Sequence, residues 1–107
     1  TQAVDAVNRF GEYVNINLYV AGYTDTVGSA ADNQRLSEAR ARSIAQSFRN
    51  RGFTFPIFFQ GFGEDGLAVA TPDGTDEVRN RRALYILAAQ APRQSRHLPR
   101  ANWRPID

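Results

Sequence analysis

The heptapeptide GYTDTVG at residues 22–28 decides how this chain folds. Alternating apolar residues over positions 16–20 precede it and predict a strand, which would deliver Asp25 to a turn bounded by two glycines. The segment NQRLSEARA at residues 33–41 has helical spacing and returns Arg40 toward the same edge. One acid and one arginine at the same edge suit a ligand that carries both an ammonium and a carboxylate. The pattern therefore favours a binding site over a reaction centre.

The helix that follows this heptapeptide has clear boundary signals. Ser29 is the expected N-cap, and Asp32 would complete a capping box in place of the usual Glu or Gln. Gly52 is expected to stop the helix after Arg51. A shorter amphipathic helix is predicted over residues 3–13, where apolar side chains recur at helical spacing.

Three strands complete the predicted fold. The first covers residues 15–22 and is expected to have one covered face, the second lies within residues 53–62 after Pro56, and the third covers residues 83–89. The order of elements predicts an α+β fold, an α/β sandwich in which two main helices pack on one face of a small mixed sheet. Because a helix that opens a fragment usually follows another element, we also expect a first strand upstream of residue 1.

Composition excludes several classes of protein. The chain has 107 residues, enough for one domain, and no cysteine, which excludes disulfides and thiolate metal sites. All thirteen basic residues are arginine, but a net charge of +2 is too small to indicate a nucleic-acid partner. No apolar run approaches the roughly 20 residues that cross a bilayer, so we expect no membrane insertion by this domain. The single histidine, His97, lies in a polar segment, so no catalytic residue, metal site or cofactor is predicted.

Two further features have ordinary explanations. The glycine-rich run GFGEDG at residues 61–66 has neither a lysine nor a helix behind it, so a plain loop is preferred to a phosphate-binding loop. The five phenylalanines within residues 53–62 are better explained by core packing than by base stacking. Residues 91–107 are rich in arginine and proline and predict an exposed tail or linker, which leaves residues 1–90 as the folded domain.

Helical geometry sets Arg40 apart from its neighbours. At about 100° per residue, Arg40 falls on the same arc as Leu36 and Ile44, the arc expected to face the core. Arg35 and Arg42 fall on the far side, toward solvent. Because an unpaired guanidinium in a core is costly, we expect Arg40 to find an anion.

Asp25 is the nearest candidate partner for Arg40, and two interpretations stay open. In one, the two residues form an internal salt bridge that ties the loop to the helix. In the other, Asp25 holds a ligand ammonium while Arg40 holds a ligand carboxylate through its bidentate fork. Free backbone amides between Gly22 and Gly28, at a helix N-terminus, would support carboxylate binding.

Several blocks of this sequence match a known family pattern. They are GYTDTVG at residues 22–28, Asn-x-x-Leu-Ser-x-x-Arg-Ala at 33–41, GFGE at 61–64 and Asn-Arg-Arg at 80–82. In this order and spacing, the chain resembles the OmpA-like domain over about residues 3 to 90. That domain is the C-terminal peptidoglycan-binding module of bacterial outer-membrane proteins, peptidoglycan-associated lipoproteins and flagellar stator proteins.

The resemblance implies non-covalent recognition of the peptidoglycan stem peptide. The usual ligand is meso-diaminopimelate, whose side chain ends in an ammonium and a carboxylate on one carbon. By this resemblance, Asp25 and Arg40 are the main ligand-holding pair, while Asn33 and Arg81 line or brace the pocket. The other residues expected to shape the pocket are Thr24, Thr26, Val27 and Leu36, and the expected structural supports are Tyr23, Gly28 and Asn80, the last tying down a loop.

Two departures from the family pattern affect this interpretation. Tyr23 stands where the family usually has histidine, although tyrosine keeps an aromatic ring and a hydrogen-bonding tip. The family's first strand and its following loop should precede residue 1, so the domain at residues 1–90 is expected to be N-terminally incomplete. An incomplete pocket would bind weakly or need a partner segment.

The resulting functional prediction is a periplasmic domain that is not an enzyme and needs no cofactor. As part of an outer-membrane or other cell-envelope protein, it would bind peptidoglycan and anchor that protein to the wall. Homodimerisation is left open. One alternative is a degenerate module that serves protein interaction or dimerisation without wall binding. Another is a wall hydrolase, against which the lack of a histidine or cysteine cluster argues.

Overall fold

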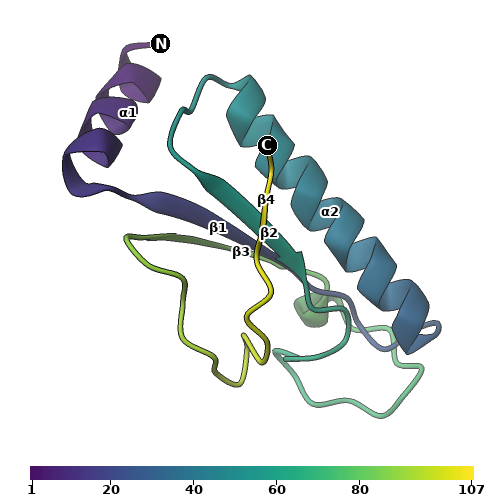
Figure 1. Ribbon diagram of the computed structural model, residues 1–107. Helices are drawn as coiled ribbons and strands as arrows, with labels where there is room; N and C mark the ends of the chain where they lie inside the picture. The colour runs from purple at the N-terminus through teal and green to yellow at the C-terminus, as the bar shows by residue number, and fades with distance from the viewer.

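An open four-stranded sheet forms the centre of the computed structural model, which describes residues 1–107 (Figure 1). The strand order is β3-β1-β2-β4, with β1 at Asn17–Gly22, β2 at Ile57–Gly61, β3 at Ala83–Ala88 and β4 at Arg104–Pro105. β1 runs parallel to β2 and antiparallel to β3, and β4 is antiparallel to β2. The predicted α+β class and the mixed sheet are confirmed.

The long helix α2 (Ala30–Asn50) connects the parallel strands β1 and β2 and lies across one face of the sheet (Figure 1). Its N-cap is Ser29, whose Oγ accepts a hydrogen bond from the backbone N–H of Asp32 at 3.0 Å. The Asp32 carboxylate pairs with Arg35, so only half of the predicted capping box forms. At the other end Gly52 adopts a φ of 98°, a left-handed conformation that ends the helix as predicted.

Glycines at the ends of β1 and β2 let α2 approach the sheet closely. Gly22 and Gly61 are paired across the two strands. A Cβ atom on Gly22 would lie 2.5 Å from the carbonyl oxygen of Ser37, and one on Gly61 would overlap the backbone of Glu38. This contact fixes the N-terminal half of α2 over the edge of the sheet where the loop after β1 begins.

Apolar side chains cover both faces of the sheet. On the α2 side, Leu18 and Val20 of β1 pack against the helix residues Ala41 and Ala45. The sequence predicted only one covered face for the strand at residues 15–22, and this prediction is wrong for β1. Tyr19 points to the opposite face, yet only 4% of it is exposed. That second face therefore carries a core of its own.

Residues near the C-terminus build this second core. Leu98 is buried, and the Trp103 ring lies edge-on to Tyr19 and to Phe62, with centroid distances of 5.3 and 5.9 Å. The expectation of an exposed tail over residues 91–107 is thus wrong for Leu98, which is buried, and for Trp103, which is partly buried, while the residues of β4 are exposed but pair with β2. These residues cover aromatic surface that would otherwise face water. Composition alone concealed this role because the apolar residues are sparse among arginines and prolines.

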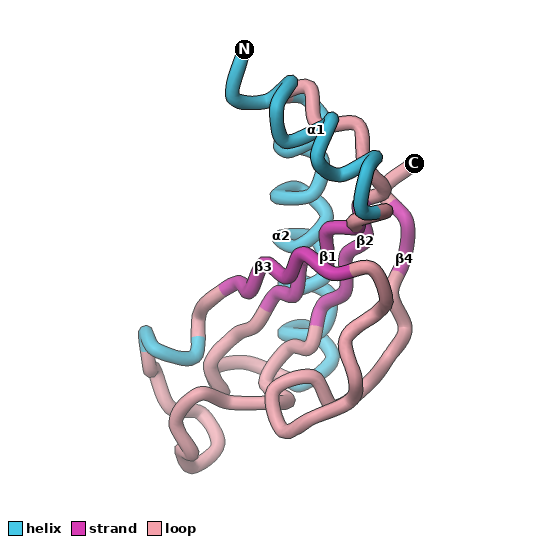
Figure 2. Tube along the Cα trace, turned by 90° about the vertical axis from the view of Figure 1, so that its left-hand side faces the viewer, coloured by secondary structure: helices cyan, strands magenta, loops and turns pink.

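The helix α1 (Gln2–Val14) extends from the start of β1 and is attached mainly at its C-terminal half (Figures 1 and 2). The Asn8 carboxamide donates to the carbonyl of Gly52 at 2.9 Å and accepts from the N–H of Thr54 at 3.0 Å. Much of the apolar stripe faces solvent, with Phe10 60% and Tyr13 89% exposed. The helix itself is confirmed. None of the helices is long and apolar enough to span a membrane.

Candidate functional site

Asp25 lies in the loop that leaves the C-terminal end of β1, and it is buried. One carboxylate oxygen accepts a hydrogen bond from the N–H of Val27 at 3.1 Å, and the other accepts from the N–H of Glu77 at 3.3 Å. The guanidinium of Arg81 forms an ion pair with the same carboxylate. Asp25 is therefore held by its own loop, by the segment before the 3₁₀ helix η1 (Val78–Asn80) and by the residue that follows η1.

These donors keep Asp25 ionised. Burial raises the pKa of its carboxyl group, but the hydrogen bonds from Arg81, Val27 and Glu77 outweigh burial and lower the pKa below its usual value. Arg81 also pairs with Asp76, and hydrogen bonds to Asp76 and Asp25 raise the pKa of its guanidinium. A fixed pair of opposite charges thus lies at this edge of the sheet.

Arg40 does not occupy the buried position that its helical spacing predicted. The residue is exposed, and it forms neither an ion pair nor a hydrogen bond through its side chain. The internal Asp25–Arg40 salt bridge considered above is wrong, because Arg81 is the partner of Asp25. Arg81 comes from a segment 56 residues away, so sequence spacing near Asp25 could not reveal it. The consequence is a cationic side chain without an acidic partner.

Asp25, Arg81 and Arg40 line one open cavity of about 310 Å³ between the loop after β1, α2 and the segment around η1. The wall contains two carboxylates and two guanidinium groups, so its formal charge is balanced. Asp76 was not among the residues selected from the sequence, because it lies in a turn-rich stretch of polar residues. The remaining lining residues are Thr24, Val27, Asn33 and Leu36, all of which were predicted.

Asn33 braces the loop as well as lining the cavity. Its side-chain N–H group donates to the carbonyls of Val27 at 2.8 Å and Asp25 at 3.3 Å, and to the Glu64 carboxylate at 3.2 Å. Thr26, in contrast, does not line the cavity. Its hydroxyl donates to the carbonyl of Pro72 at 2.9 Å and ties two loops together. Thr26 therefore has a structural position, whereas the sequence placed it among the pocket residues.

The three predicted structural supports lie outside the cavity. Asn80 is fully buried, and its side chain accepts from the N–H and donates to the carbonyl of Val69 at 2.9 and 3.0 Å, which agrees with its expected loop-tying role. Gly28 has a φ of 84°, a conformation that glycine adopts readily. Tyr23 is buried in the second core, and its hydroxyl donates to the carbonyl of His97.

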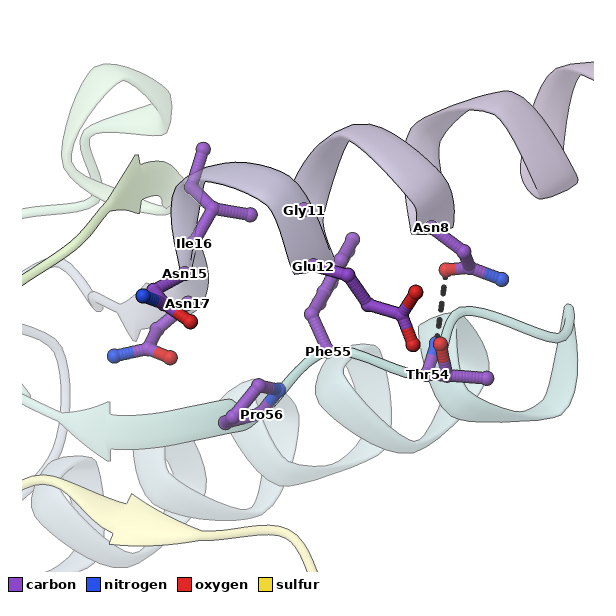
Figure 3. Close-up of a pocket in the computed structure, with 9 residues that line it drawn as sticks. All are labelled: Asn8, Gly11, Glu12, Asn15, Ile16, Asn17, Thr54, Phe55 and Pro56. Atoms are coloured by element: carbon purple, nitrogen blue, oxygen red, sulfur yellow. Dashed lines mark hydrogen bonds between the residues drawn. The ribbon is translucent and has the colours of Figure 1, made fainter.

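A second cavity, of about 290 Å³, lies at the other end of β1 (Figure 3). It is formed where α1, β1 and the turn before β2 meet. Glu12 is its only charged lining residue, and Asn8 is already engaged with Thr54 and Gly52. This cavity does not offer the opposite charges that a zwitterionic ligand requires. Its lining residues are Asn8, Gly11, Glu12, Asn15, Ile16, Asn17, Thr54, Phe55 and Pro56.

The structure is thus a small α+β domain with a charge-balanced cavity at one edge of its sheet. The model of the OmpA family matches residues 1–81, and the chain belongs to this family. Outer membrane protein A of Shimwellia blattae is 42% identical over 68 residues, which is 63% of this chain and 27% of that protein. Outer membrane protein P5 of Haemophilus influenzae is 40% identical over 71 residues, which is 65% of this chain and 20% of that protein.

A third relative, outer membrane protein A of Serratia odorifera, is 47% identical over 49 residues, which is 45% of this chain and 20% of that protein. The chain thus spans about a quarter or less of the length of these relatives. The likeness therefore covers only a part of each relative.

Proposed function

We propose that this domain binds peptidoglycan non-covalently through the diaminopimelate of the stem peptide. The observation that carries the proposal is the coexistence in one cavity of an anchored carboxylate, Asp25, and a guanidinium without an acidic partner, Arg40. A side chain that ends in an ammonium and a carboxylate on one carbon needs both charges within a small space. The balanced wall of this cavity meets that requirement.

Each charge of the ligand has a matching group. Arg40 is exposed and unpaired, so its fork is available to hold a ligand carboxylate through two parallel hydrogen bonds. Asp25 accepts the ligand ammonium on its Oδ1, where the structure records one hydrogen bond, from Val27. Asp76 supplies a second, more exposed carboxylate at the rim. Arg81 pairs with both Asp25 and Asp76 and holds the two acids near each other.

The family membership supports this proposal at a coarser level. The chain belongs to the OmpA family, and the relatives described above are named outer membrane proteins. We therefore infer that the domain resides in the periplasm as part of a cell-envelope protein and anchors that protein to the wall. The proposed activity is binding without a covalent step, and neither histidine nor cysteine lines the cavity.

Co-sedimentation with purified insoluble peptidoglycan tests the proposal. The wild-type chain should be retained, and free diaminopimelate should release it. Arg40→Ala should abolish retention without unfolding the domain, because the Arg40 side chain is exposed and unpaired. Arg42→Ala is the matched control, since Arg42 is also exposed on α2 but does not line the cavity. Equal retention of both variants would contradict the assigned pocket.

A further inference from the structure

Arg81 is shared between two carboxylates of the charge-balanced cavity. The same guanidinium nitrogen, Nη1, pairs with Oδ2 of the buried Asp25 and with Oδ1 of Asp76. An ammonium that approached Asp25 alone would meet an acid already paired with a cation, so the attraction would be largely cancelled. Asp76 adds a second carboxylate to this group. The triad of Asp25, Arg81 and Asp76 thus holds two carboxylates and one guanidinium, which leaves one net negative charge.

The backbone on both sides of Asp76 is attached to the loop after β1. The N–H of Thr75 donates to the Thr26 hydroxyl at 2.9 Å, and the N–H of Glu77 donates to the carboxylate of Asp25 at 3.3 Å. Asp76 lies between these two anchored neighbours and lines the cavity. The fold therefore sets the position of this acid, although 78% of its side chain is exposed.

Each of the two acids keeps acceptor capacity for a ligand. Arg81 contacts Oδ1 of Asp76, and Oδ2 of Asp76 accepts no hydrogen bond from within the chain. On Asp25, the oxygen Oδ1 accepts one hydrogen bond, from the N–H of Val27. An ammonium has three N–H donors, so a single carboxylate oxygen satisfies only part of it. Two acids that line one cavity meet this need better than one.

We propose that Asp76 determines the preference of this cavity for a ligand end that carries a free ammonium. The inference rests on the function proposed above and concerns the same cavity. Asp76 gives the triad its net negative charge, while Arg40 holds the ligand carboxylate. A ligand end with a carboxylate but no ammonium meets that negative charge unfavourably. Asp76 therefore acts in opposite directions on these two kinds of ligand.

Titration of the 107-residue chain with two small probes, followed by NMR, tests the proposal. The first probe, meso-diaminopimelate, carries an ammonium beside each carboxylate. The second, pimelate, has the same carbon chain and both carboxylates but no ammonium. The wild type should prefer diaminopimelate. Asp76→Asn should lower the affinity for diaminopimelate about fivefold, the upper end of what an exposed ion pair contributes, and should not lower the affinity for pimelate.

Two further variants serve as controls for Asp76→Asn. Asp73→Asn removes the same charge from the same loop, but Asp73 is exposed and does not line the cavity, so both affinities should match those of the wild type. Asp76→Glu keeps the carboxylate and should restore most of the preference for diaminopimelate. Circular dichroism should show the wild-type fold in all three variants, because both positions are exposed.

Ionic strength provides a readout that a structural role of Asp76 would not change. Raising it from about 0.01 M to about 0.15 M shortens the Debye length from about 30 Å to about 8 Å, so an exposed charge is screened more strongly. The preference of the wild type for diaminopimelate should decrease over this range. The preference of Asp76→Asn should change less, because the screened carboxylate is already removed.

The possible results separate this inference from the proposed function. A wild-type chain that does not bind diaminopimelate overturns both. If the wild type binds it and Arg40→Ala does not, the cavity is the binding site. An equal loss of affinity for both probes in Asp76→Asn would then show that Asp76 only holds Arg81 in place. That result, or an unchanged preference in Asp76→Asn, overturns the inference about Asp76 alone.

Discussion

Arg81 forms an ion pair with the buried carboxylate of Asp25, although 56 residues separate them in the chain. Because Arg81 is the partner of Asp25, the predicted pair Asp25 and Arg40 does not form, and the two residues have different roles. Asp25 stays ionised and is held in place by Arg81 and by two backbone N–H groups, whereas Arg40 has no acidic partner in the same cavity. A ligand carboxylate therefore has one guanidinium available without displacing an internal partner.

The Asp25–Arg81 pair predicts a pH-dependent contribution to stability. Asp25→Asn should lower the free energy of unfolding by about 1–2 kcal/mol at neutral pH, because hydrogen bonds to a charged group are replaced by weaker ones. The pKa of Asp25 is lowered in the folded state. The ionised Asp25 side chain thus contributes its full stabilisation at pH values above 3.8, the usual pKa of the group. This stabilisation is lost as the pH falls through the lower pKa of the folded state.

Urea titrations of wild type and Asp25→Asn from about pH 7 to about pH 3 check this prediction. The difference between the two unfolding free energies should shrink at the acidic end. Asp5→Asn, on the exposed face of α1, is a suitable control. A difference that stays constant across this range would show that the Asp25 charge does not stabilise the fold.

Arg40→Lys should weaken peptidoglycan binding although it keeps the positive charge. Lysine offers a single ammonium, whereas arginine holds a carboxylate through two parallel hydrogen bonds. Loss of one charge-assisted hydrogen bond predicts roughly a tenfold drop in affinity, or about 1.4 kcal/mol. Isothermal titration with a soluble stem peptide measures it. Unchanged affinity would mean that Arg40 acts as a point charge or lies outside the site.

Tyr23 predicts a loss of stability at alkaline pH. Burial raises the pKa of its phenol to about 12 from 10.0, although the nearby Arg82 guanidinium acts in the opposite direction. Because the folded state holds this proton more tightly, its contribution is complete below pH 10 and is lost as pH rises toward 12. Tyr23→Phe should cost about 1 kcal/mol near neutral pH, since the hydrogen bond to His97 is removed, and should flatten the alkaline decline. Thermal melts followed by circular dichroism across this pH range measure the effect. Equal alkaline losses of stability in the wild type and in Tyr23→Phe would show that ionisation of Tyr23 is not the cause.

Gly61→Ala should severely destabilise the domain. Its new methyl group would overlap the backbone of Glu38 and lie 2.5 Å from the Ser37 hydroxyl oxygen, so α2 would have to move off the sheet. We expect a loss of about 3 kcal/mol or more in the free energy of unfolding, measured by urea denaturation. Gly74→Ala is the matched control. It has a positive φ of 73° but no atom within 4 Å of the added Cβ, so about 1 kcal/mol of backbone strain is expected there. An equal effect at both positions would refute the packing argument.

Trp103→Ala tests whether the C-terminal residues belong to the core. The ring contacts Tyr19 and Phe62, and its removal should lower the free energy of unfolding by about 2–3 kcal/mol because the side chain is only partly buried. Circular dichroism in urea measures the change, since Trp103 is the only tryptophan and its fluorescence is lost. The exposed neighbour Ala101→Ser should have little effect. A negligible loss for Trp103→Ala would restore the interpretation of these residues as a tail.

Local signals in the sequence predicted most of the elements. Ser29 and Gly52 bracket α2 as their capping preferences indicated, and the alternation over residues 16–20 marked β1. The blocks shared with the OmpA family also selected most of the residues that line the cavity. These features depend on neighbours a few positions apart, which a linear sequence displays directly.

Only the tertiary structure decided which residues from distant parts of the chain contact each other. Helical spacing placed Arg40 inward, but the actual position of α2 over β1 and β2 leaves it exposed, and Arg81 takes its expected place beside Asp25. The second core behind Tyr19 likewise depends on Trp103, whose segment looks like a tail by composition. The sequence by itself determined the elements and the chemistry of their side chains, because propensity and capping are local. Which charges meet, and which apolar surfaces stay open, depended on how distant segments pack.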